Sequence, residues 1–258
     1  MKFIDVHCHL DGRHFENLNE LFNNMSACGV EKAITCGVDL TTSAAVKEIA
    51  ERYAGCYFTA GFHPTELKEY RETGLDKIAA LATHSKCVAI GEIGLDYHYP
   101  DTDKPLQKDV FIKQLQLAYD LGLPVQIHSR NSAEDMYEIL KANSSLLKHG
   151  FLLHCYSHSA ELAAELEKMG AYFSFGGTST YSGSKKARRA IASLGLDRLL
   201  TETDSPYMPP VSRMGQFPNT PESIPEISSN FAALHGVTEA ECAERIWQNA
   251  HRLFEKLN

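Results

Sequence analysis

Short apolar runs alternate with amphipathic stretches along the whole chain, and this alternation constrains the fold more than any other feature. The runs are mostly continuous in apolar residues, as expected for strands that are buried on both faces of a sheet. The predicted strands span residues 3–8, 32–36, 57–62, 88–92, 124–128, 151–154, 171–175 and 198–203. Strands that alternate with helices predict an α/β fold with a parallel sheet, and eight of them predict a (β/α)8 TIM barrel.

Local signals mark where some of the intervening helices begin and end. Pro105 suits the first turn of a helix, and Gly122 suits the position just after its last turn. Ser132 with Asp135 has the spacing of a capping box, in which side chains satisfy the free backbone N–H groups at the start of a helix.

A single domain over residues 1–258 is the expected organisation, because one barrel of this kind takes about 250 residues. The sequence shows no internal repeat, low-complexity tract or linker. A doubly wound open sheet is the alternative, but neither a GxGxxG motif after the first strand nor a GxxxxGK(S/T) motif is present. Residues 207–220 form the longest irregular segment, and a loop of that length in a compact domain is usually functional.

Composition argues against several classes of protein. The formal net charge of −8 disfavours broad binding of duplex DNA, although an enzyme could still handle one phosphate in a locally positive cleft. No apolar stretch approaches the about 20 residues of a membrane span, and the N-terminus carries no signal-type segment. The seven cysteines show no CxxC pairing and are expected to be reduced and mostly buried. We therefore expect a cytoplasmic protein without membrane association, and we infer no stable protein partner.

Histidines and carboxylates recur at the ends of the predicted strands. His7 and His9 project the same way because side chains alternate along a strand. The carboxyl ends of all barrel strands lie on one face, so these residues are expected to meet at one mouth. The predicted metal ligands are His7, His9, Glu92, His128, His154 and Asp204. Each alone has a structural interpretation, such as a strand cap or a hydrogen-bonded core histidine, but the whole set indicates a metal site.

This ligand set suits two divalent cations better than one. It exceeds the four ligands of a structural zinc, and Glu92 can bridge because a carboxylate offers one oxygen to each cation. A water bridging the cations would become a hydroxide nucleophile near neutral pH. Zinc, manganese and magnesium all accept these ligand types. Two such cations with two carboxylates and a hydroxide leave about one positive charge, which favours an anionic substrate.

Residues beside the ligands are expected to act on the substrate. His63 could donate a hydrogen bond to a developing oxyanion, or it could cap a tight turn before Pro64. Arg130 can offer a two-pronged guanidinium contact to phosphate. Asp204 can also orient or deprotonate the attacking water. The expected catalytic residues are Asp204, Glu92 and His63, and the expected substrate-binding residues are His63 and Arg130.

Other features have open interpretations. Asp96 either orients a ligand or caps a loop, and Asp5 either orients the histidines or has a buried structural role. Gly176-Gly177-Thr178-Ser179 follows the seventh strand, where barrels often bind phosphate, although a flexible loop looks the same. Alternation predicts that Cys8 and Cys155 face the helical layer, which argues against a thiol nucleophile.

Taken together, these motifs resemble those of the TatD-type metal-dependent DNases, a family of amidohydrolase-like barrel enzymes. The similarity covers nearly the whole chain, in order and at compatible spacings. The matching segments are Asp5-Val6-His7-Cys8-His9, Gly61-Phe62-His63-Pro64, Gly91-Glu92-Ile93-Gly94-Leu95-Asp96-Tyr97, His128-Ser129-Arg130, His154-Cys155-Tyr156-Ser157, Thr203-Asp204-Ser205-Pro206-Tyr207 and Asn249-Ala250-His251-Arg252-Leu253-Phe254.

The resemblance implies a divalent-metal-dependent phosphodiesterase or deoxyribonuclease of the 3′→5′ exonuclease kind. Its substrate would be a nucleic-acid end or another phosphodiester, and His63 would be the phosphate-contacting histidine. The family's metal ligands would correspond to His7, His9, Glu92, His128, His154 and Asp204.

The chain departs from the family pattern around the expected pocket rim. Residues 210–219 keep little of the basic charge that many members carry there. Thr65 and Glu66 stand where a His-Asp pair is usual, and His158 stands where a small residue is common. These departures weaken the substrate assignment more than the assignment of the chemistry.

Two other function classes stay open. A metal-dependent amidohydrolase or esterase acting on a small metabolite or an aminoacyl group would use the same site, and the acidic composition favours it. A non-catalytic barrel that binds nucleic acid or protein would leave the converging ligands unexplained. Phosphodiester hydrolysis is the expected function, because Arg130, His63 and the positive charge left over at a site with two cations all suit phosphate.

Overall fold

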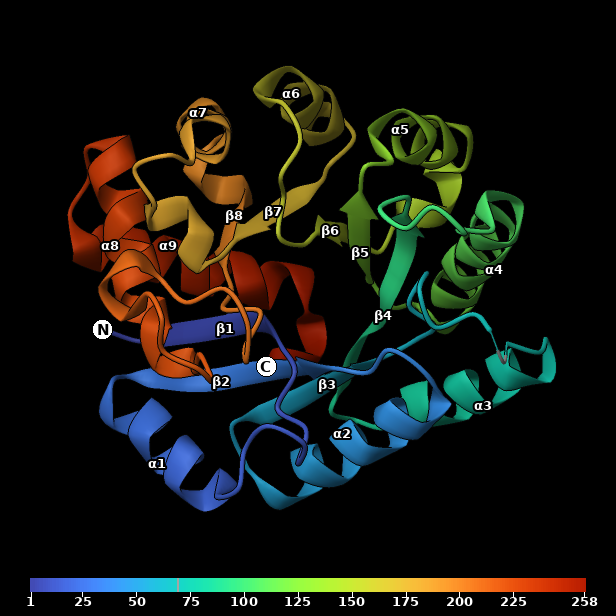
Figure 1. Cartoon of the computed structure of the whole chain (residues 1–258), viewed down its shortest axis with the longest axis horizontal. Helices are drawn as coiled ribbons and strands as arrows, with labels where there is room; N and C mark the ends of the chain where they lie inside the picture. Colours follow the sequence, from blue (N-terminus) through green and yellow to red (C-terminus); the bar gives the residue numbers. More distant parts are fainter. Residues whose placement is uncertain (69) are drawn as a thin grey trace.

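The computed structural model describes residues 1–68 and 70–258, and its eight strands form one parallel sheet in the order β1 to β8. Figure 1 shows the helices outside the ring of strands. The prediction of a (β/α)8 TIM barrel is confirmed. The strands are β1 Phe3–Cys8, β2 Val30–Cys36, β3 Cys56–Ala60, β4 Cys87–Asp96, β5 Val125–Arg130, β6 Phe151–Leu153, β7 Tyr172–Phe175 and β8 Leu199–Thr201.

An α-helix follows each strand, and a further helix ends the chain. The helices are α1 Leu18–Ala27, α2 Leu40–Arg52, α3 Thr73–Ala82, α4 Lys104–Leu121, α5 Ala133–Ala142, α6 Ala160–Lys168, α7 Lys185–Ser193, α8 Ile224–His235 and α9 Glu239–Leu253. Pro105 lies in the first turn of α4, and Gly122 follows its last turn with a φ of 70°, as predicted. Ser132 precedes α5, but its hydroxyl donates to the carbonyl of Leu95 at 3.1 Å. The predicted capping box at α5 is therefore wrong.

Strand β4 is longer than the sequence predicts. The apolar run suggested an end at Glu92, but β4 continues to Asp96. The carboxylates of Glu92 and Asp96 are both buried, and His128 contacts each of them at 3.0 Å, which offsets the cost of burying their charge. A charged side chain with such partners need not turn to solvent, so Glu92 lies in the middle of the strand.

Backbone hydrogen bonds join β1 to the segment after β8. The amide of Asp204 donates to the carbonyl of His7 at 2.9 Å, and the amide of His9 donates to the carbonyl of Ser205 at 2.7 Å. This seam closes the barrel and places His7, His9 and Asp204 side by side.

Alternation along β1 separates apolar from polar side chains. Ile4, Val6 and Cys8 are fully buried in the apolar core that includes residues of the surrounding helices. Asp5 and His7 are equally buried but face the barrel interior, where they contact polar groups of the segment after β8 and of β5. The interior near the mouth is therefore polar, while the layer between sheet and helices is apolar.

Residues 207–220 form a mostly irregular loop after β8, interrupted by the short 3-10 turn η4 (Val211–Arg213). Its occurrence between the last strand and α8 agrees with the expected long loop. Of the helices that the structure describes, none combines the length and apolar character needed to cross a membrane.

Candidate metal centre

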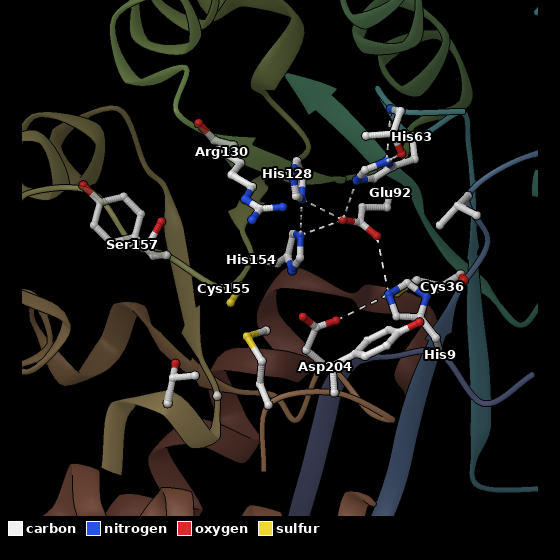
Figure 2. Close-up of a pocket in the computed structure, with 18 of the residues that line it drawn as sticks. His9, Cys36, His63, Glu92, His128, Arg130, His154, Cys155, Ser157 and Asp204 are labelled. Atoms are coloured by element: carbon white, nitrogen blue, oxygen red, sulfur yellow. Dashed lines mark hydrogen bonds and ion pairs between the residues drawn. The ribbon is translucent and has the colours of Figure 1, made fainter. Parts of the chain in front are cut away.

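The predicted ligand residues meet at the carboxyl end of the barrel, and Figure 2 labels all of them except His7. His7 lies on β1, His9 just after β1, Glu92 on β4, His128 on β5, His154 directly after β6 and Asp204 after β8. Except for His7, all of them line a cavity of about 820 Å³. His7 is fully buried and stacks on His154, with ring centroids 3.8 Å apart.

Three atoms with lone pairs face one another on the β1 side of the cavity: His7 Nε2, His9 Nε2 and Asp204 Oδ1. His7 Nδ1 lies 2.8 Å from Gln126 Oε1, and Gln126 Nε2 is already donating to a backbone carbonyl of β1 at 2.7 Å. His9 Nδ1 lies 3.2 Å from the carbonyl of Cys36. When the rings are neutral, the proton of each therefore lies on Nδ1, and both Nε2 atoms present lone pairs. The Nε2 atoms are 3.2 Å apart and lie 3.6 and 3.4 Å from Asp204 Oδ1.

A second set of acceptor atoms faces Glu92 from β5 and β6. Asp96 Oδ2 lies 3.0 Å from His128 Nε2 and fixes the proton there, which leaves His128 Nδ1 as an acceptor. His128 Nδ1 and His154 Nε2 are 3.2 Å apart and lie 3.0 and 2.8 Å from Glu92 Oε1. Glu92 Oε2 lies 3.5 and 3.6 Å from the Nε2 atoms of the first group. The two oxygens of Glu92 thus face different groups.

The lone pairs of the nitrogen and oxygen atoms in these two groups repel one another at such distances unless a proton or a metal cation lies between them. Burial alone would lower the pKa of His9 and His128, but the neighbouring carboxylates outweigh it and raise both to about 9. Burial and the charge of His154 lower the pKa of His7 to about 3. In the described part of the chain, the ion-pair partners of Glu92 and Asp204 are all histidines. This donor set fits divalent cations, which accept imidazole and carboxylate ligands.

His63 follows β3 and points at Glu92 (Figure 2). The Thr65 hydroxyl lies 2.8 Å from His63 Nδ1, and the backbone N–H of Thr65 donates to the same nitrogen at 3.2 Å. With Nδ1 as the acceptor of this N–H, the proton of the neutral ring lies on Nε2. His63 Nε2 is 3.3 Å from Glu92 Oε1. Burial lowers the pKa of His63 and favours the neutral ring. Although His63, Glu92 and His128 are close enough to hold a metal, the protonated Nε2 suits donation to a ligand better than metal binding.

Arg130 ends β5, two residues after His128, and its guanidinium group points into the cavity (Figure 2). It forms no hydrogen bond or ion pair with the other residues labelled there. Its donors are thus directed at the space beside His128 and His154, where an anion could accept from them.

Asp96 and Asp5 have different roles. Asp96 contacts the ring of His128 and also accepts from the backbone N–H two residues later at 2.9 Å, so both expected roles are present. Asp5 accepts from the backbone N–H groups of His7 and Thr203 at 3.2 and 3.0 Å, and burial raises its pKa to about 8. Because Asp5 contacts backbone N–H groups and the hydroxyl of Thr203, and no imidazole, its role is the structural one.

The sequence analysis overlooked Gln126. This fully buried side chain fixes the proton of His7 and so directs the lone pair of His7 toward Asp204. A signal was present, because Gln126 lies two positions before His128 and alternation places both on the same face of β5.

Glu202 was also overlooked. It is fully buried, accepts from Ser174 Oγ at 2.5 Å, and has its pKa raised to about 7 by burial. Its Oε2 lies 3.8 Å from His154 Nδ1, and His7, His154 and Glu202 are close enough together to hold a metal. The available signal was a glutamate within the predicted strand 198–203, although β8 itself ends at Thr201.

Cys155 does not face the helical layer, contrary to the prediction. It lines the cavity and is partly exposed, because β6 ends at Leu153 and Cys155 has a φ of 45°, where strand alternation no longer applies. Cys8 is buried outside the cavity, as expected. Burial and the charge of Glu202 raise the pKa of Cys155 well above its usual value, which keeps the thiol protonated.

Comparison with known proteins gives a consistent result. The sequence model of the family described as TatD-related DNase matches residues 4–255. An uncharacterized metal-dependent hydrolase, YabD of Bacillus subtilis, is 37% identical over 251 residues, which cover 97% of this chain and 98% of the relative. A second uncharacterized metal-dependent hydrolase, YcfH of Escherichia coli, is 32% identical over 258 residues and covers 98% and 96% of the two chains.

A solved structure agrees in fold and sequence. The crystal structure of YjjV, a TatD homologue from Escherichia coli, superposes with a TM-score of 0.93 at 32% identity. The match covers 98% of each chain.

Proposed function

Because the chain belongs to the TatD-related DNase family and is a metal-dependent hydrolase, we propose that it cleaves phosphodiester bonds at nucleic-acid ends. The observation that carries this proposal is the pairing of two kinds of groups in one cavity. Lone pairs converge on both sides of Glu92, while the donors of His63 and Arg130 point into the same space. The converging lone pairs suit cations, and the N–H donors of His63 and Arg130 suit an anion.

We assign the candidate ligands to two cation sites. His7, His9 and Asp204 would hold one divalent cation, and His128 and His154 would hold the other. Glu92 would give one oxygen to each. Zinc, manganese or magnesium would satisfy these ligands. Such a pair, when bound, polarises the phosphate and makes a water acidic enough to attack near neutral pH.

The remaining steps belong to side chains of the protein. Asp204 would accept a proton from the attacking water through the carboxylate oxygen that does not face the histidines. His63 Nε2–H would donate to the negative charge that develops on the phosphate oxygens. The fork of Arg130 would bind the same phosphate and orient it for in-line attack.

A specific observation supports a second candidate, the hydrolysis of an amide or ester. The cavity is also lined by Asp11 and Asp39. Asp11 is ion-paired with Arg13, so Asp39 is the acidic group that disfavours a long polyanion. An amidohydrolase acting on a small metabolite or an aminoacyl group would use the same cations and the same donor from His63.

A substrate panel distinguishes the two. Single-stranded DNA and DNA with a labelled 3′ overhang would be incubated with the protein and magnesium, manganese or zinc, beside small phosphodiester, ester and amide substrates. We expect loss of nucleotides from DNA ends and hydrolysis of the small phosphodiester. Intact DNA together with a cleaved amide or carboxylic ester would reject the phosphodiesterase and support the second candidate.

A further inference from the structure

Exposed apolar side chains gather on the loop beside the cavity. The most exposed large apolar residues of this loop are Tyr207 (49%), Val211 (50%), Met214 (60%) and Phe217 (64%). The other exposed large apolar residues in the described ranges lie singly and far apart in the chain. Scattered apolar residues are normal on a protein surface, but exposed aromatic rings next to a cavity can serve as a binding surface.

Three rings connect this loop to the cavity. The ring of His14 lies 5.7 Å from that of Phe217 at 87°, and 6.0 Å from that of Tyr207 at 69°. Tyr207 and Phe217 are 6.4 Å apart at 45°. Rings that meet at such angles do not cover each other's faces as parallel stacks do. His14 and Tyr207 also line the cavity, so we call His14, Tyr207 and Phe217 the aromatic rim.

Buried hydrogen bonds hold the aromatic rim close to the candidate metal centre. The amide of Tyr207 donates to the carbonyl of Asp204 at 2.9 Å. Asn219 is 2% exposed, and its Nδ2 donates to the carbonyls of Tyr207 and Thr203 at 2.8 and 3.2 Å. Asn219 therefore ties the two ends of the loop together, and the rim keeps a fixed position next to Asp204.

We propose that the aromatic rim is a stacking platform for the nucleobase next to the scissile phosphate, an inference that rests on the proposed phosphodiesterase function. Exposed aromatic faces bind any base, because every base has a π face. The guanidinium group of Arg130 points into the same cavity and suits a phosphate-linked ligand, whereas that of Arg13 is ion-paired with Asp11. A ligand with both an aromatic ring and a phosphate is a nucleotide unit. The unit belongs to a single-stranded end, because a base inside a duplex already has both faces stacked.

A fluorescence titration tests the platform without turnover. The probe is a single-stranded oligonucleotide with 2-aminopurine at its 3′ end and a slowly hydrolysed phosphorothioate as its last linkage. Stacking on an aromatic ring quenches 2-aminopurine, so we expect quenching by the wild-type protein. Tyr207→Leu and Phe217→Leu keep apolar bulk but remove the ring, and each should reduce the quenching and raise Kd between about 5-fold and about 100-fold.

Two further variants serve as controls. Met214→Ala removes an equally exposed apolar side chain from the same loop and should bind like the wild type. Phe217→Tyr keeps a ring and should restore the quenching that Phe217→Leu loses. Wild-type binding without quenching, or full quenching by both Leu variants, would overturn the proposal. A change of oligomeric state in the Leu variants with unchanged quenching would also overturn it and would assign the rim to contacts between copies of the chain.

A kinetic comparison distinguishes failure of the platform from failure of the proposed function. Oligonucleotides with either a base or an abasic site at the 3′ end are offered to each variant. We expect the wild-type protein to show a lower KM for the base-bearing end, and the Leu variants to lose that preference. Equal KM values for both ends in the wild type would overturn the platform while leaving the phosphodiesterase intact. Quenching that depends on the rings, in a protein that cleaves neither end, would support the platform and reject the function.

Discussion

The floor and the rim of the cavity are built in opposite ways. At the floor, His7, Glu92 and His154 are buried, and their polar atoms face groups from other strands. At the rim, Tyr207 and Phe217 leave ring surface in solvent. The floor is therefore ordered before a substrate arrives, whereas the rim offers surface that a ligand can cover. We expect changes at the floor to alter metal content and turnover, and changes at the rim to alter binding.

Glu92→Gln should have the largest effect, because one oxygen of Glu92 faces each ligand group. Both cations should bind more weakly. The fall in kcat should exceed the about 1000-fold loss that removal of one transition-state donor can cause. Elemental analysis and kinetics check the two quantities. Glu66→Gln, the control, changes an exposed carboxylate that lines the same cavity away from the floor, and this variant should retain its metal. Equal losses of metal and of kcat in both variants would contradict the special role of the floor.

His63→Ala should lower kcat by about 100- to 1000-fold while leaving the metal content unchanged. The reason is that His63 Nε2 carries a proton and acts on the substrate, not on a cation. His63→Gln keeps an N–H donor and should recover part of the activity. Loss of metal in His63→Ala would move His63 from the substrate side of the site to the ligand set.

Gln126→Leu should weaken metal binding by about 10- to 100-fold, the usual cost of losing a group that orients a ligand. Without the acceptor at Gln126, His7 is free to hold its proton on the nitrogen that faces Asp204. Competition with a fluorescent chelator measures the affinity. Gln126→Glu keeps an acceptor oxygen and should bind more tightly than the Leu variant; the reverse order would exclude this role.

Asp39→Ala should have the smallest effect, because Asp39 lines the cavity outside the aromatic rim and its carboxylate caps helix α2. Its carboxylate accepts from the backbone N–H of Thr42 at 2.7 Å, and the Thr42 hydroxyl accepts from the backbone N–H of Asp39. Loss of this capping box should cost about 1 kcal/mol of folding free energy. Thermal unfolding should show a fall in Tm of about 2–4 °C. A loss of metal in this variant would show that Asp39 and the floor are coupled.

The sequence predicts the barrel well because its strands are buried on both faces. Runs such as residues 3–8 have an apolar pattern that surface segments lack, and β1 begins and ends where the pattern does. The convergence of the candidate ligands follows from the same topology, since all carboxyl ends of a parallel barrel share one face. His7 and Asp204 could be placed together without knowledge of any side-chain contact.

Features that depend on contacts between distant segments were not predictable in the same way. Nothing near Glu92 in the sequence shows that histidines of other strands will keep it inside β4. Cys155 faces the cavity because a turn replaces the strand that alternation assumed. The aromatic rim requires the folded path of a loop that has no repeating pattern, so the packing of His14 on Phe217 appears only in three dimensions.

The seam between β1 and the segment after β8 also constrains biosynthesis. His7 and His9 leave the ribosome early, whereas Asp204 and Ser205, which hydrogen-bond to their backbones, are translated much later. His7 and His9 must therefore wait for the whole of the intervening chain to be translated before their neighbours exist. A nascent chain cannot assemble the complete pocket until Asp204 and Ser205 have left the ribosome, so a ribosome-bound intermediate that lacks them should be catalytically silent.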